Sequence, residues 1–304
     1  MNMAIIDIGS NTIRLNIYAT EGQDYRLLLT KKHTAGLAAY VENKRLSKQG
    51  IKRLSEILSR LKRILDNVLV DEIHIFATAS LRNVSNGREV MQKMAESVGL
   101  PLEIVGEDEE ARLGNLAIRT KHQVKRGMSC DIGGGSTEIV QFDRETNQLY
   151  PLADGSLSLY LQFVSGIFPK AGEARAMARY IRQALPELPQ SKQLLAIGGT
   201  ARAAGKAIAM LKDLDSPEEA VADPHSFSYK ELKDLINSLI DEEVHAVKSL
   251  LRVAPERVHT IVPGMIILRE IAKKIRAKKI LVCEEGVREG YLIDRLQGAR
   301  HDEA

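Results

Sequence analysis

The chain has 304 residues, 44% of them hydrophobic and 27% charged, which predicts a globular protein with room for two domains. Its net charge of +3 is too small to indicate nucleic-acid binding, and no apolar run approaches the roughly 20 residues of a membrane span. Cys130 and Cys283 stand in apolar runs, which argues against a disulfide framework or a cysteine metal site and favours the cytoplasm. The first residues are apolar for only four positions before Asp7, as in a buried strand rather than a signal peptide.

Strands and helices alternate through the first half of the chain. An amphipathic helix is expected after Ser47, which can cap it, because apolar residues recur on one face from Ile51 to Leu65. The polar and basic segment Lys121 to Gly127 is interpreted as the crossover between two domains. The other elements expected here are strands over 4–8, 13–18, 25–29, 72–77 and 102–105, and helices over 89–98 and 108–120.

The second half shows the same alternation. Ser216 and Ser228 each begin a capping box, which predicts a helix after each, and Pro263 is expected to start a helix that continues to Lys274. The last residues, 299–304, are expected to fray. The other elements expected here are strands over 128–132, 138–142, 148–152, 194–197 and 279–283, and helices over 157–164, 173–185 and 286–297.

One motif occurs twice. Asp7-Ile8-Gly9 and Asp131-Ile132-Gly133 each end an apolar strand and are followed by small polar residues. A second strand, a third strand, and then further helices and strands follow both copies in the same order. This agreement favours an ancient duplication and an α/β fold class with layered sheets.

The two glycine turns suggest phosphate binding. A turn without Cβ atoms lets the backbone approach a ligand, and its successive N–H groups form a nest for an anion. A simple hairpin turn is the plain alternative for either copy alone. Two copies favour a pair of phosphate-binding turns, with side-chain donors and flexible backbone supplied by Ser10, Asn11, Thr12, Gly134, Gly135, Ser136 and Thr137.

Carboxylates accompany these turns. Asp7 and Asp131 lie at the carboxyl ends of strands, where α/β proteins bind ligands, and Glu138 follows seven positions after Asp131. Such carboxylates suit Mg²⁺ shared with phosphate oxygens, although Asp7 and Asp131 could instead cap their own turns. A further acidic run, 107–110, opens a helix and complements its dipole, while one of its four carboxylates could position a water for attack. Composition does not show which of these four carboxylates would position the water.

Basic residues gather in three places, 31–33, 60–63 and 273–279. Such runs usually form a solvated face of a helix or strand. The alternative interpretation is a basic rim that attracts a polyanion.

Six ordered motifs resemble the exopolyphosphatase and guanosine pentaphosphate phosphatase family over essentially the whole chain. The resemblance implies two duplicated actin-like (ribonuclease H-like) domains with an interdomain cleft, as in the superfamily of acetate and sugar kinases, actin and heat-shock ATPases. It implies an N-terminal domain of residues 1–124, a C-terminal domain of 125–285, and a final helix, 286–304, that packs back on the first. The motifs are Asp7-Ile-Gly-Ser-Asn-Thr12, Ala77-Thr-Ala-Ser-Leu-Arg-Asn-Val-Ser-Asn86, Glu109-Glu-Ala-Arg112, Asp131-Ile-Gly-Gly-Gly-Ser-Thr-Glu138, Val262-Pro-Gly264 and Gly286-Val-Arg-Glu-Gly290.

The resemblance also implies roles for single residues. Glu110 matches the catalytic glutamate of the family, and Glu138 matches a carboxylate that supports catalysis. Arg82 matches the arginine that grips substrate phosphate, and Arg14 holds a position often basic in relatives. Further roles implied are metal binding by Asp131 and Glu138, and a glycine turn at the substrate site formed by Gly198, Gly199 and Thr200. Asp7 is expected to bind the metal as well, because of its place at the end of a strand.

The sequence therefore predicts a cytoplasmic hydrolase that uses Mg²⁺, or Mn²⁺, to release terminal phosphate from inorganic polyphosphate. Guanosine pentaphosphate is the alternative substrate, and a nucleotide-dependent kinase or a binding protein without turnover are the alternatives of another class. Intact Glu110, Asp131 and Glu138 argue against loss of turnover. No membrane or nucleic-acid partner is expected, and a homodimer is left open. The segment 33–40 departs from the family pattern, which leaves its substrate contacts open.

Overall fold

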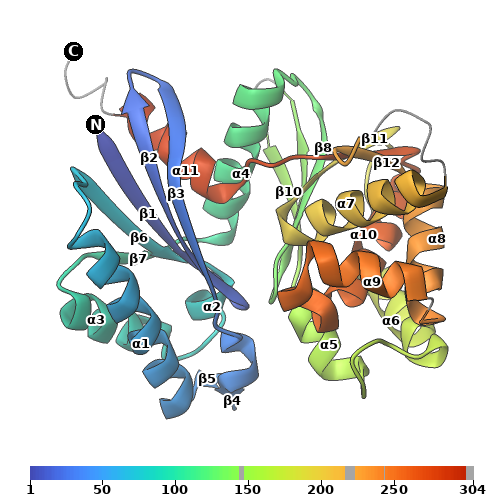
Figure 1. Cartoon of the computed structure of the whole chain (residues 1–304), viewed down its shortest axis with the longest axis horizontal. Coiled ribbons are helices and arrows are strands. Elements are labelled where there is room, and N and C mark those ends of the chain that lie inside the picture. Colours follow the sequence, from blue (N-terminus) through green and yellow to red (C-terminus); the bar gives the residue numbers. More distant parts are fainter. Residues whose placement is uncertain (144–146, 216–222, 243, 299–304) are drawn as a thin grey trace. The chain divides into compact units, whose positions relative to one another are not determined.

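The computed structural model describes residues 1–143, 147–215, 223–242 and 244–298 (Figure 1). The chain forms two compact units, and the chain from Val287 onward belongs to the first unit although it follows the second in sequence. The first unit holds residues 1–116 and the second holds 117–286, so the division falls within a helix rather than in the polar segment after it. Among the described helices, none is long and apolar enough to cross a membrane.

The first unit is built on a five-stranded sheet in the order β3-β2-β1-β6-β7, in which β1, β2 and β3 are antiparallel neighbours and β6 and β7 continue parallel to β1. The strands are β1 (Asn2–Ile8), β2 (Thr12–Glu21), β3 (Asp24–Thr34), β6 (Glu72–Ala77) and β7 (Leu102–Ile104). The helices are α1 (Lys48–Leu65), α2 (Ala79–Arg82), α3 (Gly87–Val98), α4 (Glu107–His122) and α11 (Val287–Gly298), and the short elements are η1 (Leu37–Tyr40), β4 (Val41–Glu42) and β5 (Arg45–Leu46).

Alternation along β1 gives the first unit two cores, one on each face of its sheet. Ile6 and Ile8 pack with the apolar stripe of α1, and the Ser47 hydroxyl caps that helix by accepting from the Gly50 N–H, as predicted. Ile5 points to the opposite face and packs with Tyr291 of α11. The final helix therefore supplies part of the core of the unit in which the chain begins.

The second unit repeats this plan with a six-stranded sheet in the order β10-β9-β8-β11-β13-β12. Again the first three strands are antiparallel neighbours, and β11 and β13 continue parallel to β8. The strands are β8 (Gly127–Ile132), β9 (Thr137–Phe142), β10 (Asn147–Leu152), β11 (Gln193–Ile197), β12 (Ser226–Ser228) and β13 (Lys279–Val282). The helices are α5 (Ser156–Phe163), α6 (Ala171–Ala184), α7 (Gly198–Asp215), α8 (Tyr229–Ile240), α9 (Val244–Val253) and α10 (Val258–Lys274), with the short η2 (Pro255–Arg257) before the last.

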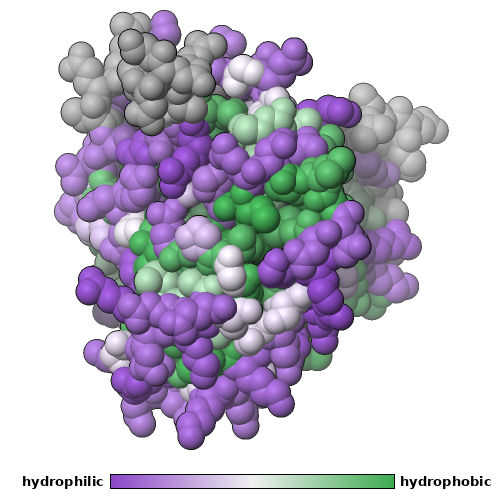
Figure 2. Space-filling view, turned by 90° about the vertical axis from the view of Figure 1, so that its left-hand side faces the viewer, coloured by the Kyte–Doolittle hydropathy of each residue, from purple (hydrophilic) through white to green (hydrophobic). Residues whose placement is uncertain are grey.

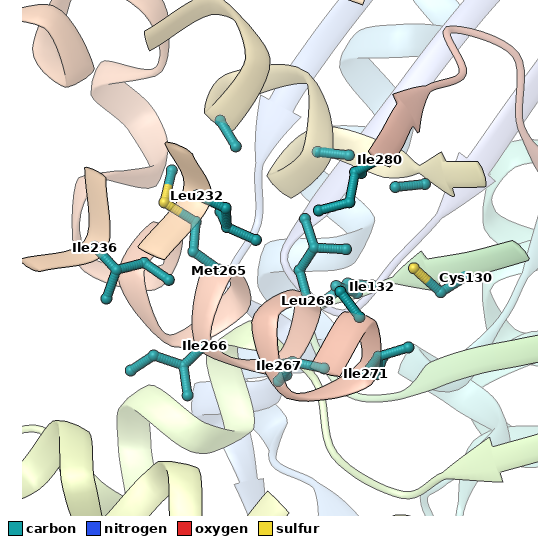
Figure 3. Close-up of a cluster of buried hydrophobic side chains, with 14 of the residues drawn as sticks. Cys130, Ile132, Leu232, Ile236, Met265, Ile266, Ile267, Leu268, Ile271 and Ile280 are labelled. Carbon is teal, nitrogen blue, oxygen red and sulfur yellow. The ribbon is translucent and has the colours of Figure 1, made fainter. Parts of the chain in front are cut away.

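Helix α10 runs through the core of the second unit. Its buried residues, among them Met265, Leu268 and Ile271, pack with Cys130 and Ile132 of β8 (Figure 3). The prediction that Pro263 starts this helix is wrong, because α10 begins at Val258 and holds Pro263 inside it. Proline costs a helix about 3 kcal/mol through its missing N–H, and we attribute its tolerance here to burial of the apolar residues on both sides.

The repeated strand order confirms the duplication and the α/β class that the sequence predicted. The capping box at Ser228 is also confirmed, with the Ser228 N–H donating to Glu231 Oε2 at 2.6 Å. The one predicted at Ser216 lies outside the described residues, as does the segment expected to fray. Helix α7 was not predicted, because its first residues, Gly198 and Gly199, are typical of a turn.

Candidate active site

The first glycine turn, residues 9–12, joins β1 to β2. The Gly9 N–H donates to the Thr12 carbonyl oxygen at 3.1 Å, and a Cβ on Gly9 would lie only 3.0 Å from that oxygen. Asn11 is 5% exposed, and its Nδ2 has no hydrogen-bond partner in the described part of the chain. A buried donor without a partner is costly, so this amide is suited to a ligand oxygen.

The segment that follows β3 holds this turn in place. The backbone N–H groups of Ala35 and Gly36 both donate to the Asn11 carbonyl oxygen, at 2.8 and 2.9 Å. The Ala38 N–H donates to the Ser10 carbonyl oxygen at 3.1 Å. These bonds occupy the carbonyl groups of the turn. The segment 33–40, whose role the sequence left open, therefore fixes the shape of the first turn.

The second turn, between β8 and β9, has the same geometry. The Gly133 N–H donates to the Ser136 carbonyl oxygen at 3.0 Å, and a Cβ on Gly133 would lie 3.1 Å from that oxygen. Here the segment after β10 supplies the support: the Ser156 N–H donates to the Gly133 carbonyl oxygen at 2.9 Å, and the Ser158 N–H to that of Gly134 at 3.0 Å. Gly134 and Gly135 add no side chains, so the second turn offers mainly backbone groups to a ligand.

Two predicted metal ligands lie together beside the second turn. Asp131 and Glu138 are directly paired across β8 and β9, so their side chains leave the same face of the sheet. Glu138 is 4% exposed and accepts a hydrogen bond from Ser136 Oγ at 2.7 Å. The described residues contain no group of three or more metal-binding side chains. Two carboxylates nevertheless fit Mg²⁺, which usually takes its other ligands from phosphate and water.

The carboxylate of Asp131 explains the glycine that follows β11. Gly198 has φ of +91°, and a Cβ there would lie 2.6 Å from Asp131 Oδ1. Glycine is therefore required both by the backbone conformation and by the space that the carboxylate occupies. The predicted turn residues Gly198, Gly199 and Thr200 form the first turn of α7 beside Asp131.

Arg257 is a residue of this region that sequence reasoning missed. A Cβ on Gly199 would lie 2.5 Å from the Arg257 guanidinium carbon, so the cation lies directly on the glycine backbone. Gly264 similarly admits Thr200 Oγ1, which would lie 2.6 Å from its Cβ. The motif Val262-Pro-Gly264 was noticed in the sequence, but nothing in the pattern indicated that an arginine shortly before it reaches α7.

The first unit brings Arg82 and Glu110 together. Arg82 Nη1 lies 2.6 Å from Glu110 Oε2 and also donates to the Val105 carbonyl oxygen at 3.1 Å. Arg82 ends the short helix α2, and Glu110 stands in the first turn of α4, so the ends of β6 and β7 position the pair. Their side chains are 15% and 11% exposed. A guanidinium at this distance stabilises negative charge on the carboxylate and limits its orientation.

The other acidic residues of this run have different contacts. Glu109 receives two hydrogen bonds from Arg112, both of 2.7 Å, and these bonds lower the pKa of its carboxyl group. Glu107 lies 3.7 Å from Arg82 and is 40% exposed. Of the four carboxylates that composition did not distinguish, Glu110 makes the short bond to the predicted phosphate-binding arginine.

Asp7, predicted as a metal ligand, is bound by an arginine of the final helix. Arg288 Nη1 donates to Asp7 Oδ2 at 2.8 Å. Burial raises the pKa of Asp7, while Arg288 and Arg14, its pairing partner on β2, act in the opposite direction. Next to this pair, the Tyr18 hydroxyl donates to Glu289 Oε1 at 2.6 Å. These contacts fasten α11 to the sheet, and metal binding by Asp7 stays a prediction.

Comparisons with known proteins identify the family and the fold. The model of the Ppx/GppA phosphatase family matches residues 16–299. A protein named Exopolyphosphatase 1 from Mycobacterium bovis is 24% identical over 97% of this chain and 88% of its own length. A crystal structure of an exopolyphosphatase from Cytophaga hutchinsonii has a TM-score of 0.81 at 20% identity, and one of the Aquifex aeolicus Ppx/GppA family member has 0.78 at 23%, each over 98% of both chains. The similarity to these structures shows the fold.

Proposed function

Because the chain belongs to the Ppx/GppA phosphatase family, we propose that it is an exopolyphosphatase-type hydrolase that releases the terminal phosphate of inorganic polyphosphate. The observation that carries the proposal is the short Arg82–Glu110 pair, in the unit that also holds the buried Asn11 amide, whose Nδ2 has no partner among the described residues. A cation and a donor suit phosphate oxygens, and a carboxylate suits the attacking water. Guanosine pentaphosphate has a similar reactive end and is the second candidate.

In this mechanism Glu110 orients a water molecule and accepts its proton while the water oxygen attacks the terminal phosphorus. The bridging P–O bond breaks, and the products are one phosphate and a chain shorter by one unit. Arg82 keeps Glu110 in position and stabilises charge on the transferred group. Phosphoryl transfer depends mainly on positioning and electrostatic stabilisation, which these residues supply. Arg14, Ser10 and Thr12 are further proposed phosphate contacts.

The cofactor proposed is Mg²⁺, with Mn²⁺ as a substitute, held by Asp131 and Glu138. When bound, such an ion neutralises charge on phosphate oxygens. Ser136 supports this role because its hydroxyl donates to Glu138 Oε1 at 2.7 Å and so helps to fix the orientation of the carboxylate. The backbone of Gly134 and Gly135, together with Gly199 and Thr200, would contact phosphate in the second unit. We also propose a cytoplasmic location, because Cys130 and Cys283 are free, buried thiols.

The test is phosphate release from long-chain polyphosphate, guanosine pentaphosphate and ATP, measured side by side with Mg²⁺ and with excess chelator. We expect release from polyphosphate, one phosphate at a time, and its loss in chelator. No release from polyphosphate, with efficient cleavage of guanosine pentaphosphate, would favour the second candidate. Transfer of phosphate from ATP to a sugar or acid would overturn both.

A further inference from the structure

A basic groove of about 770 Å³ lies between α1 and α3 on the first unit. Both helices cover the same face of the sheet, and they pack side by side (Figure 1). On the face of the molecule that Figure 2 shows, hydrophilic side chains surround a band of hydrophobic ones. The charged residues that line the groove are five cations and one acid: Lys48, Lys52, Arg60, Arg63, Lys93 and Glu56.

The five cations of this groove are not neutralised by neighbouring acids. All five are exposed, and in the described part of the chain none of them forms an ion pair with an acidic side chain. Lys62, from the same basic run of the sequence, behaves differently, because its Nζ lies 2.8 Å from Asp66 Oδ1. The groove therefore keeps a net positive charge, which favours binding of an anion.

The positive charge continues from the groove onto the edge strand β3. Burial lowers the pKa of His33, and Arg60, Arg53 and Lys31 lower it further. Arg60 both lines the groove and acts on His33, so α1 carries cations toward the groove and toward β3. The positive surface formed by the groove and β3 includes two of the three basic clusters noticed in the sequence, 31–33 and 60–63.

The shape of the groove suits an extended ligand. Its cations on α1 extend from Lys48 to Arg63, which is about 22 Å along a helix. Ser55 and Ser59 add hydroxyl groups from α1, whereas the Ser97 hydroxyl on α3 donates to the Met94 carbonyl oxygen at 3.0 Å. A compact nucleotide would meet only part of this stripe, whereas a linear polyanion could follow it.

Helix α3 connects the groove with the proposed active site. Its first residue, Gly87, is packed so closely on α2 that a Cβ would overlap the Leu81 carbonyl oxygen, at 1.9 Å. Arg82, the partner of Glu110, is the next residue of α2. Lys93 lies about 9 Å further along α3 from Gly87. A chain whose end reaches Arg82 therefore has a basic surface on the neighbouring helix.

We propose that this groove binds the distal part of a long polyphosphate chain, an inference that rests on the proposed function. The groove would hold the chain while its end is cleaved, so that it adds affinity only for substrates long enough to reach it. It has no role in the bond-breaking step.

The test compares wild type with the triple variant K52A/R60A/K93A. The matched control is R175A/R179A/K233A, which removes the same charge from exposed residues of the second unit. KM and kcat are measured with tripolyphosphate and with polyphosphate of about 100 units at several salt concentrations. We expect the groove variant to raise KM for the long chain at least about tenfold. The slope of log KM against log salt concentration should fall by about 2, since each of the three cations contributes about 0.7. For the groove variant, KM and kcat with tripolyphosphate and the thermal unfolding should match those of wild type. The control variant should match wild type in all of these measurements.

Equilibrium binding separates failure of this inference from failure of the proposed function. Binding of the long chain is measured by calorimetry in a Glu110→Gln background, with and without the groove substitutions. Weaker binding in the groove variant supports the inference even where wild type releases no phosphate. Unchanged binding, an equal loss in the charge-matched control, or tighter binding of single-stranded RNA of equal charge to the groove would each overturn it.

Discussion

The two glycine turns have the same backbone but differ in what they present to a ligand. In each, a glycine N–H donates to the carbonyl oxygen three residues later, at 3.1 Å from Gly9 and 3.0 Å from Gly133. In each, the segment after the third strand donates N–H groups to the carbonyl oxygens of the turn. The first turn then carries Ser10 and Asn11, both buried, where the second carries Gly134 and Gly135.

This difference indicates that, after the duplication, the backbone hydrogen bonds that hold each turn were kept, while the residues that the turn presents to a ligand changed. The first unit holds both the turn with side-chain donors and the Arg82–Glu110 pair, whereas the second places backbone N–H groups next to two paired carboxylates. The first arrangement suits acid–base chemistry and direct phosphate contacts. The second suits an anion whose charge is shared with a cation.

The largest expected effect separates the chemistry of the two units. Glu110→Gln removes the proposed proton acceptor but keeps its shape, so turnover of polyphosphate should fall by about 10²- to 10⁴-fold with little change in binding. Steady-state phosphate release measures this. Glu107→Gln is the matched control, because that carboxylate lies 3.7 Å from Arg82 and is more exposed. Near-normal turnover in Glu110→Gln would remove this residue from the mechanism.

The next prediction concerns the carboxylates of the second turn. Glu138→Gln should raise the Mg²⁺ concentration needed for half-maximal activity by at least about 10- to 100-fold, the range found when groups around a metal are altered. A Mg²⁺ titration of activity measures this shift. Glu187→Gln, on a side chain that is 95% exposed, should not change it. Equal Mg²⁺ requirements in wild type and Glu138→Gln would mean that Glu138 serves the fold.

A paired substitution tests whether the two turns are equivalent as structures. Gly9→Ala and Gly133→Ala each bring a Cβ close to a backbone oxygen, at 3.0 and 3.1 Å. Each should lower the free energy of unfolding by about 1–3 kcal/mol, as overpacking does. Gly172→Ala is the control, because its Cβ would meet nothing within 4 Å. Urea unfolding measures all three, and a loss in only one turn variant would show that the turns differ in rigidity.

The smallest expected effect concerns the side-chain donor of the first turn. Asn11→Ala removes an amide that has no hydrogen-bond partner in the described residues, so stability should hardly change. KM for polyphosphate should rise about tenfold, the value of one hydrogen bond to a charged group. Asn16→Ala is the control, and it should lower stability without changing KM, because the Asn16 amide donates to the Tyr18 hydroxyl at 2.6 Å. Loss of stability without a change in KM in Asn11→Ala would contradict the assignment.

Much of the fold could be predicted because local patterns and burial agree. The apolar stripe of α1 and the apolar run of β1 predicted a buried helix face and a buried strand, and both are buried as expected. Prediction failed where tertiary burial overrides a local signal. Pro263 marked a helix start but lies inside α10, and the glycine pair that begins the alanine-rich α7 indicated a turn.

The contacts between residues of the candidate site could not be predicted from the sequence. The motifs identified Arg82 and Glu110 separately, but no spacing in the sequence indicates that their side chains meet at 2.6 Å. Asp7 and Arg288 stand 281 residues apart, so their ion pair depends on the path of the whole chain. The groove between α1 and α3 likewise required the packing of two helices, since its cations come from segments that are separate in sequence.

The place of α11 has a consequence for synthesis on the ribosome. This helix supplies Val287, Tyr291 and Leu292 to a core whose strands come from the start of the chain. Residues 117–286 form the whole second unit and are translated before α11. Domains generally fold as units while the chain is being made. We therefore expect the middle of the nascent chain to reach its native structure first, while the earliest residues wait for the last helix to complete their unit.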